Sequence, residues 1–122
     1  MLLFKPEHTD LILSGRKVQT RRLGKRRWKV GSVHGCYTRP PFAKGGAEPF
    51  CRVRILDVRQ ERLCGVSSRD AKAEGYEDGE AFVRAFWRIN GLEPRDASKG
   101  PLDAQVGLDP SVWVVTFDVV TP

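Results

Sequence analysis

The sequence predicts an α+β fold, a small and mostly antiparallel β-barrel flanked by short α-helices. Two observations predict this class. Strand-like segments follow one another along the chain, and sequential strands usually pair as neighbours. The helical patterns, by contrast, are few and short. The chain has 122 residues, enough for one hydrophobic core and too few for two ordinary ones, so we expect a single domain over residues 1–122.

The N-terminal segment predicts a strand followed by a helix. Leu2–Phe4 is a short apolar run of strand type. Pro6 suits the first turn of a helix, and the apolar residues at 11–13 supply a face to bury. Gly15 comes next and suits the left-handed residue that closes a helix. We therefore expect a short helix between Pro6 and Gly15.

The middle of the chain predicts two more strands. The segment 33–38 has strand composition. The segment 50–58 gives the clearest strand signal, because Cys51, Val53 and Ile55 alternate with other residues at period two. The pattern continues for several residues beyond 58, so we expect the strand to extend past a bend or a bulge.

Two helices are predicted next by capping residues at Ser67 and Asp78. The first helix is expected over about 68–74, with Gly75 as its stop. The second helix is expected to place three apolar side chains on one face: Phe82, Phe86 and Ile89.

The segment 112–119 predicts the closing strand. It is apolar on both faces, which is typical of a central strand covered on two sides. The stretches at 39–49 and 93–110 are rich in Pro, Gly and polar residues and predict mobile loops.

The positive charge is concentrated near the N-terminus. Ten Lys or Arg residues and no Asp or Glu lie between Leu11 and Ala47, which leaves −4 for the rest of a chain whose net charge is +6. This segregation is typical of a protein that contacts a polyanion or a phosphate-bearing substrate. Trp28 lies among these cations and permits two interpretations: it stacks on a base, or it plugs the edge of the barrel.

Other classes of function have little support in the sequence. The three cysteines, Cys36, Cys51 and Cys64, have no metal-binding spacing, so we expect free thiols, no metal site and no cofactor. No apolar run is long enough to span a bilayer, and the first residues lack the layout of a signal peptide. We therefore expect a cytoplasmic protein without membrane association, and we favour a monomer.

The segment Gly15–Arg22, followed by Trp28–Gly31, resembles the signature of the ASCH domain, a PUA-like β-barrel. The segments 70–76 and 112–117 extend the resemblance over nearly the whole chain. The resemblance implies RNA or a modified nucleoside, such as a cytidine derivative, as the partner. The loops at 39–49 and 93–110 carry no resemblance.

One bacterial branch of this family, the N4-acetylcytidine amidohydrolases, removes an acyl group from the exocyclic nitrogen of cytidine. The resemblance implies that its catalytic lysine, threonine and glutamate correspond to Lys17, Thr20 and Glu74. The candidate residues for binding nucleic acid or substrate are Arg16, Arg21, Arg22, Lys25, Arg26, Arg27, Trp28, Lys29 and Arg39.

A mechanism follows as a hypothesis. Lys17, with its pKa lowered by burial and by nearby arginines, takes a proton from the Thr20 hydroxyl, which attacks the acyl carbonyl. Glu74 then activates water or protonates the leaving amine, and Arg22 or a backbone N–H steadies the oxyanion. Residues 17 and 20 have opposite parity in a regular strand, so the scheme requires Lys17 to precede the strand or a bulge to separate the two.

Two alternatives stay open at this point, a non-catalytic RNA-binding module and a ribonuclease. In the binding alternative, Lys17 and Arg22 contact phosphate and Thr20 is an ordinary strand residue. Glu74 is then a salt-bridge partner of the basic segment.

Overall fold

The computed structural model describes residues 1–40, 42, 45–92 and 109–120. Its elements confirm an α+β fold with a few short helices. In chain order they are β1 (Leu2–Leu3), the 3-10 helix η1 (Pro6–His8), α1 (Thr9–Leu13), β2 (Gln19–Arg22), β3 (Val33–Tyr37), β4 (Cys51–Arg62), the 3-10 helix η2 (Leu63–Gly65), α2 (Ser68–Ala73), α3 (Gly79–Ile89) and β5 (Ser111–Val119).

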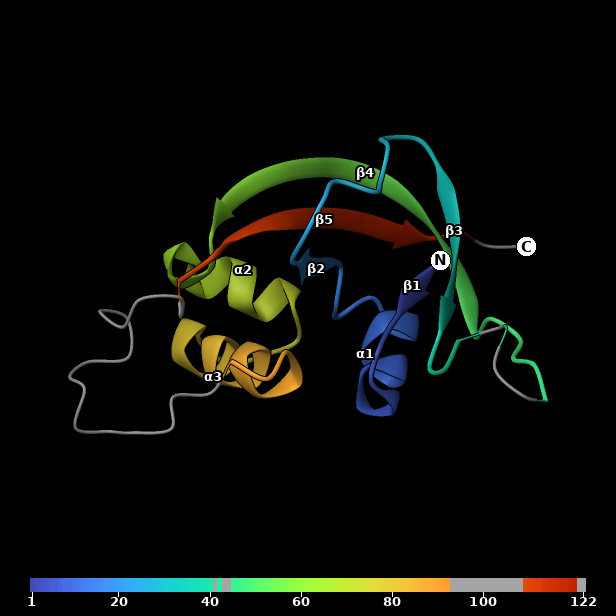
Figure 1. Ribbon diagram of the computed structural model, residues 1–122, viewed down its shortest axis with the longest axis horizontal. Helices are drawn as coiled ribbons and strands as arrows, with labels where there is room; N and C mark the ends of the chain where they lie inside the picture. Colours follow the sequence, from blue (N-terminus) through green and yellow to red (C-terminus); the bar gives the residue numbers. More distant parts are fainter. Residues whose placement is uncertain (41, 43–44, 93–108, 121–122) are drawn as a thin grey trace.

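The five strands form one sheet in the order β1-β3-β4-β5-β2. The β1–β3 pair is parallel and the other three pairs are antiparallel, so the predicted mostly antiparallel arrangement is confirmed. The sheet curls into a half-barrel whose two edge strands are β1 and β2. In Figure 1 the long strands β4 and β5 arch over the helices, with α2 and α3 beneath one end and α1 beneath the other.

A bulge helps this curl. The register of β4 against β5 shifts between Ile55 and Asp57, so one extra residue, Leu56, stands on β4. A bulge bends a strand and increases its twist. The sequence predicted a bend or bulge after residue 58; the structure places the bulge earlier, at Leu56, and six further paired residues of β4 follow it.

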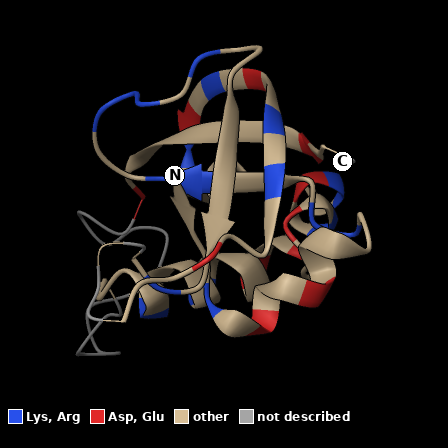
Figure 2. Cartoon of the chain, turned by 90° about the vertical axis from the view of Figure 1, so that its right-hand side faces the viewer, with Lys and Arg blue, Asp and Glu red and all other residues tan. Residues whose placement is uncertain are grey.

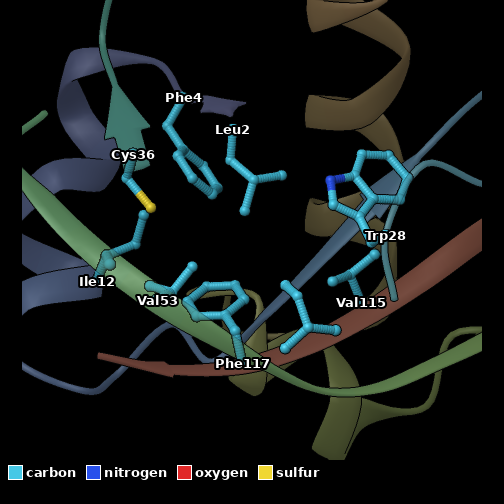
Figure 3. Packing of buried hydrophobic residues seen from close by; sticks show 9 residues of the cluster. Leu2, Phe4, Ile12, Trp28, Cys36, Val53, Val115 and Phe117 are labelled. Atoms are coloured by element: carbon cyan, nitrogen blue, oxygen red, sulfur yellow. The ribbon is translucent and has the colours of Figure 1, made fainter. Parts of the chain in front are cut away.

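Strand β5 lies between β4 and β2 and faces two hydrophobic clusters, as its apolar sequence predicted. Val114 and Val115 are both fully buried but belong to different clusters, because successive strand residues point to opposite faces. The first cluster, shown in Figure 3, is Leu2, Phe4, Ile12, Trp28, Cys36, Val53, Ile55, Val115 and Phe117. The second is Leu63, Ala71, Phe82, Val83, Phe86, Trp87, Val112 and Val114.

The predicted helix starts are confirmed. The Ser67 hydroxyl accepts from the Asp70 N–H at 3.0 Å, and the Asp78 carboxylate accepts from the Ala81 N–H at 2.8 Å. Ile89 departs from the predicted apolar face, because it lies in the last turn of α3 and is 41% exposed.

The N-terminal helical segment divides into η1 and α1, and the thiols are placed as expected. Cys36 is buried, Cys51 and Cys64 are half-buried, and none of the three forms a disulfide. Within the described ranges, no helix has the length and hydropathy that crossing a bilayer requires. Most of the predicted loop at 93–110 lies outside the described residues, which omit 93–108, and so do residues 41 and 43–44 of the predicted loop at 39–49.

Candidate active site

Buried polar side chains gather at one place in the fold. The described residues include six such side chains: His8, Lys17, Gln19, Thr20, Arg21 and Glu74. All of them except Gln19 line a single pocket of about 100 Å³, between the edge strands of the sheet and helix α3. Burying polar groups is costly unless they are paired, and such clusters in a pocket are typical of functional sites.

The turn after α1 delivers Lys17 to this pocket. Gly15 has a φ of 78°, in the left-handed region that glycine readily adopts. The backbone N–H groups of Arg16 and Lys17 both donate to the Leu11 carbonyl, at 3.0 and 2.9 Å. Lys17 therefore precedes β2, which begins at Gln19. This is the first of the two arrangements that the proposed chemistry required.

Glu74 lies at the C-terminal end of α2 and contacts Lys17 there. The Lys17 ammonium donates to the Glu74 carboxylate at 2.8 Å and to the Glu74 main-chain carbonyl at 3.0 Å. Both side chains are almost fully buried, at 3% and 2% exposure. The backbone N–H of Val18 donates to the Ala73 carbonyl at 2.7 Å, which ties the end of α2 to the start of β2.

The environment of Lys17 lowers the pKa of its ammonium group. Burial lowers the pKa of the Lys17 ammonium, because a charged group is poorly solvated inside the fold. Glu74 opposes this shift, while Arg22 and Arg21 lower the pKa further by repulsion. A lysine in this setting can exchange a proton near neutral pH more readily than an exposed one.

Thr20 is held by Arg22. The Arg22 Nε donates to the Thr20 Oγ1 at 3.0 Å, and its Nη2 donates to the Leu3 carbonyl at 2.8 Å. The guanidinium also lies over the Phe4 ring, 4.8 Å from its centroid. Because the Thr20 oxygen accepts from Arg22, its hydroxyl proton is free to be donated to another group. Arg22 thereby links the two sheet edges, since Leu3 ends β1.

Arg21 lines the pocket, but its terminal donors point to carboxylates of the protein. Its guanidinium is fully buried, and both terminal nitrogens are bound to carboxylates of the protein. Nη1 donates to Glu74 at 2.8 Å, and Nη2 donates to Glu61 at 2.7 Å and Asp70 at 3.1 Å. Substrate binding by Arg21 stays a prediction, and its terminal nitrogens already donate to carboxylates of the protein.

His8 and Tyr76 are among the pocket residues that the sequence did not predict. Both residues line the pocket, and the His8 Nε2 lies 3.1 Å from the Tyr76 hydroxyl. Burial and the nearby Lys17 lower the pKa of His8 to about 4, so its imidazole is neutral at pH 7. In the sequence, His8 is an isolated histidine near the start of the first predicted helix. Only its burial and its contact with Tyr76, 68 positions away in the chain, indicate that His8 belongs to the site.

The remaining wall of the pocket is largely aromatic. Phe82 and Phe86 of α3, together with Phe4 and Tyr76, line it alongside the charged groups. Tyr76 and Phe82 pack edge-on, with ring centroids 5.6 Å apart. A pocket with aromatic walls and a few convergent polar groups suits a planar ligand that carries a polar reacting group.

Trp28 is a core residue and does not lie on the surface. Its side chain is 8% exposed, and Figure 3 shows its indole beside Val115 and Leu2. The second of the two interpretations from the sequence, a plug inside the barrel, is therefore the one observed. A buried indole cannot stack on a base, so the structure does not support the binding role predicted for Trp28.

The other predicted cations stand apart from the pocket. Six of them are exposed and do not line it: Arg16, Lys25, Arg26, Arg27, Lys29 and Arg39. Four belong to the loop between β2 and β3, which carries successive blue segments in Figure 2. Arg26 lies 6.0 Å from the Trp113 ring centroid. Among the described residues, no group of three His, Cys, Asp or Glu side chains could hold a metal ion.

Comparison with known structures identifies the fold. The crystal structure of protein EF3133 from Enterococcus faecalis V583 is 21% identical and superposes with a TM-score of 0.68, over 93% of this chain and 67% of that one. The ASCH domain from Lactobacillus crispatus is 24% identical and superposes with a TM-score of 0.57, over 91% of this chain and 69% of that one. No protein-family model and no curated protein matches the sequence.

These similarities establish the architecture, as the sequence resemblance predicted. At such low identity they do not identify the reaction, which must be argued from the residues of the pocket.

Proposed function

From the ASCH fold of this chain and the chemistry of its pocket, we propose that the protein is an amidohydrolase. Its substrate is a nucleoside acylated on an exocyclic amine, with N4-acetylcytidine as the reference compound. One observation carries the proposal: the buried Lys17 amine contacts the Glu74 carboxylate at 2.8 Å in a pocket that Thr20 also lines. A nucleophile, a base and a carboxylate in one pocket form the constellation expected for acyl transfer.

In the first step, Thr20 is the nucleophile. Its hydroxyl proton passes to the neutral Lys17 amine while Oγ1 attacks the acyl carbonyl carbon. Arg22, which already donates to Oγ1, stabilises the negative charge that develops as the proton leaves. Lys17 then gives its proton to the departing amine. The C–N bond breaks, free nucleoside is released, and the acyl group stays on Thr20 as an ester.

In the second step, Glu74 acts as a base toward water. The hydroxide attacks the Thr20 ester, the C–O bond to Oγ1 breaks, and the carboxylic acid leaves. The proton taken up by Glu74 passes to Oγ1, which restores the Thr20 hydroxyl and the Glu74 carboxylate. The sequence left two roles open for Glu74, water activation and protonation of the amine. Both oxygens of Glu74 accept a hydrogen bond, one from Lys17 and one from Arg21, and this acceptor geometry supports the first role.

The dimensions of the pocket support a small acyl group and a base. A volume of about 100 Å³ suits an acetyl amide and part of a pyrimidine, with the ribose outside. Lys5 is exposed and also lines the pocket, so it stands where a ribose or a phosphate would pass.

A second candidate function is RNA binding by the loop between β2 and β3. Four exposed cations in this loop favour it: Lys25, Arg26, Arg27 and Lys29. Phosphate contacts hold a nucleic acid without reading its sequence. The two functions are compatible, since the loop would hold an RNA whose modified base enters the pocket.

The decisive test is acetate release from N4-acetylcytidine. We expect the wild-type protein to produce acetate and cytidine, Thr20→Ala to produce neither, and Thr20→Ser to retain turnover. Thr38→Ala, at an exposed threonine, is the matched control and is expected to behave as wild type. Unchanged turnover in Thr20→Ala excludes the threonine nucleophile. Fragmentation of RNA by metal-free protein, lost in Lys17→Ala, instead supports the ribonuclease alternative.

A further inference from the structure

We infer that Arg21 is a positioning residue for the proposed reaction, which fixes the Glu74 carboxylate against Lys17 without touching substrate. The catalytic part of this inference rests on the proposed function. The hydrogen bonds of Arg21 on which it is based do not depend on that function. They concern a side chain that the sequence alone assigned to the substrate.

The donors on the two terminal nitrogens of Arg21 are all used inside the protein. Nη1 donates to Glu74 Oε2 at 2.8 Å and to Gln19 Oε1 at 3.1 Å. Nη2 donates to Glu61 Oε1 at 2.7 Å and to Asp70 Oδ2 at 3.1 Å. Each terminal nitrogen of a guanidinium carries two hydrogens, so all four have an acceptor. The remaining Nε is buried and has no partner.

The carboxylate of Glu74 is consequently held at both oxygens. Oε1 accepts from Lys17 and Oε2 accepts from Arg21, both at 2.8 Å. With one cation on each oxygen, the carboxylate cannot turn without losing a charge-assisted hydrogen bond. Arg21, by binding Oε2, thus fixes the orientation in which Oε1 of Glu74 meets Lys17.

Arg21 is itself anchored to two other elements. Glu61 lies in β4 and Asp70 in α2, while Arg21 belongs to β2. Asp70 and Glu74 are four residues apart and therefore lie on one side of the end of α2, where a single guanidinium can reach both. The guanidinium also lies 5.5 Å from the Phe82 ring centroid of α3. Three elements converge on this cation and fix where Glu74 stands.

Only an arginine serves this arrangement. A lysine carries one compact ammonium, and it cannot span acceptors on both sides of a planar fork. Arg21→Lys therefore keeps the charge but loses part of the four contacts. Arg21→Met removes the charge and keeps a long apolar stem.

Arg59 offers a matched control in the same network. Its Nη2 donates to Asp70 at 2.9 Å, and its Nε lies 3.5 Å from Glu61, so it shares two carboxylates with Arg21. It is 40% exposed and makes no recorded contact with Glu74. Arg59→Met thus removes a cation from the network and leaves the Glu74 carboxylate as it is.

The first experiment measures turnover of N4-acetylcytidine by the full chain. We expect Arg21→Met and Arg21→Lys to lower kcat by about 10²-fold with KM within a few-fold of wild type, since a displaced catalytic group costs about that much. Arg59→Met is expected to keep the wild-type kcat. Circular dichroism and thermal unfolding check that each variant is folded. A folded Arg21→Met variant with wild-type kcat overturns the inference, and a rise in KM alone assigns Arg21 to the substrate instead.

The second experiment does not depend on activity. The change in melting temperature on Glu74→Gln is measured in wild type, in Arg21→Met and in Arg59→Met. We expect Glu74→Gln to cost clearly less in Arg21→Met, because the partner of Oε2 is already gone. The cost in Arg59→Met should equal that in wild type. Equal costs in all three backgrounds overturn the contact between Arg21 and Glu74. If the costs show that Arg21 and Glu74 are coupled but the protein releases no acetate, the contact is supported and the proposed function is refuted.

Discussion

The Lys17 ammonium donates to the Glu74 carboxylate at 2.8 Å, although 57 positions separate the two residues. Both side chains are buried, so removing either charge leaves the other without a counter-ion and costs stability. The proposed reaction depends on this contact. Its energetic weight can also be measured without any substrate.

Glu74→Gln is expected to lower the free energy of unfolding by about 3 to 5 kcal/mol, because it leaves the buried Lys17 charge without its counter-ion. Urea denaturation at neutral pH measures this change. Glu80→Gln is the matched control: Glu80 pairs with Arg84 at 2.9 Å, but the pair is exposed. That control should change stability by less than about 0.5 kcal/mol. Similar costs at both positions contradict a buried pair.

The rate of amide hydrolysis is expected to rise with pH. Burial lowers the pKa of Lys17, and the amine form that accepts the Thr20 proton becomes more abundant as the pH increases. We therefore expect kcat/KM to increase from about pH 6 toward about pH 9. Lys17→Arg supplies a cation that does not deprotonate, so it should abolish the rate at every pH. A rate that falls over this range contradicts a lysine base.

Stability is expected to fall in acid because of His8. Its pKa is about 4 in the folded protein and 6.5 in the unfolded chain, so between these values only the unfolded state binds the proton. Stability contributed by His8 is full above pH 6.5 and is lost as the pH falls toward 4, by up to about 3 kcal/mol. Urea denaturation at pH 7 and pH 4.5 measures the loss. The loss should be smaller in His8→Asn, and equal losses in the two proteins contradict the buried neutral imidazole.

RNA binding, if the loop between β2 and β3 carries it, is expected to weaken steeply with salt. Each phosphate contact contributes about 0.9 to the slope of log K against log salt. Lys25→Gln combined with Arg27→Gln should therefore reduce the slope by about 2 for an RNA duplex. Lys72→Gln with Arg69→Gln, two exposed cations of α2, is the control and should leave the slope unchanged. A flat salt response in wild type argues against an RNA partner.

Local chemistry was sufficient to predict the elements that frame the site. Ser67 and Asp78 cap their helices because a short polar side chain reaches a free N–H two or three residues away. Gly15 takes its left-handed conformation because it has no Cβ to clash. Period-two alternation marked the first part of β4, whereas the bulge at Leu56 lies earlier than the bend or bulge expected after residue 58. Lys17, Thr20 and Glu74 were identified by resemblance to a sequence signature.

Tertiary packing decided which of the charged side chains face the pocket. Nothing in the sequence distinguishes Arg21 from Arg22, yet Arg21 is enclosed by carboxylates from β4 and α2, and Arg22 holds the hydroxyl of Thr20. Trp28 was ambiguous for the same reason, and it became a core residue because the curled sheet leaves room for an indole beside Leu2 and Val115.

What the sequence by itself determined was therefore local: the helix caps, the strand periods and the excess of cations before residue 47. The tertiary structure alone decided that Lys17 meets Glu74, that His8 meets Tyr76 and that Arg21 is buried. The physical reason is that these pairings are interactions between elements far apart in the chain. Their energy depends on burial and on the direction of approach, which only the curled sheet and the helices beneath it supply.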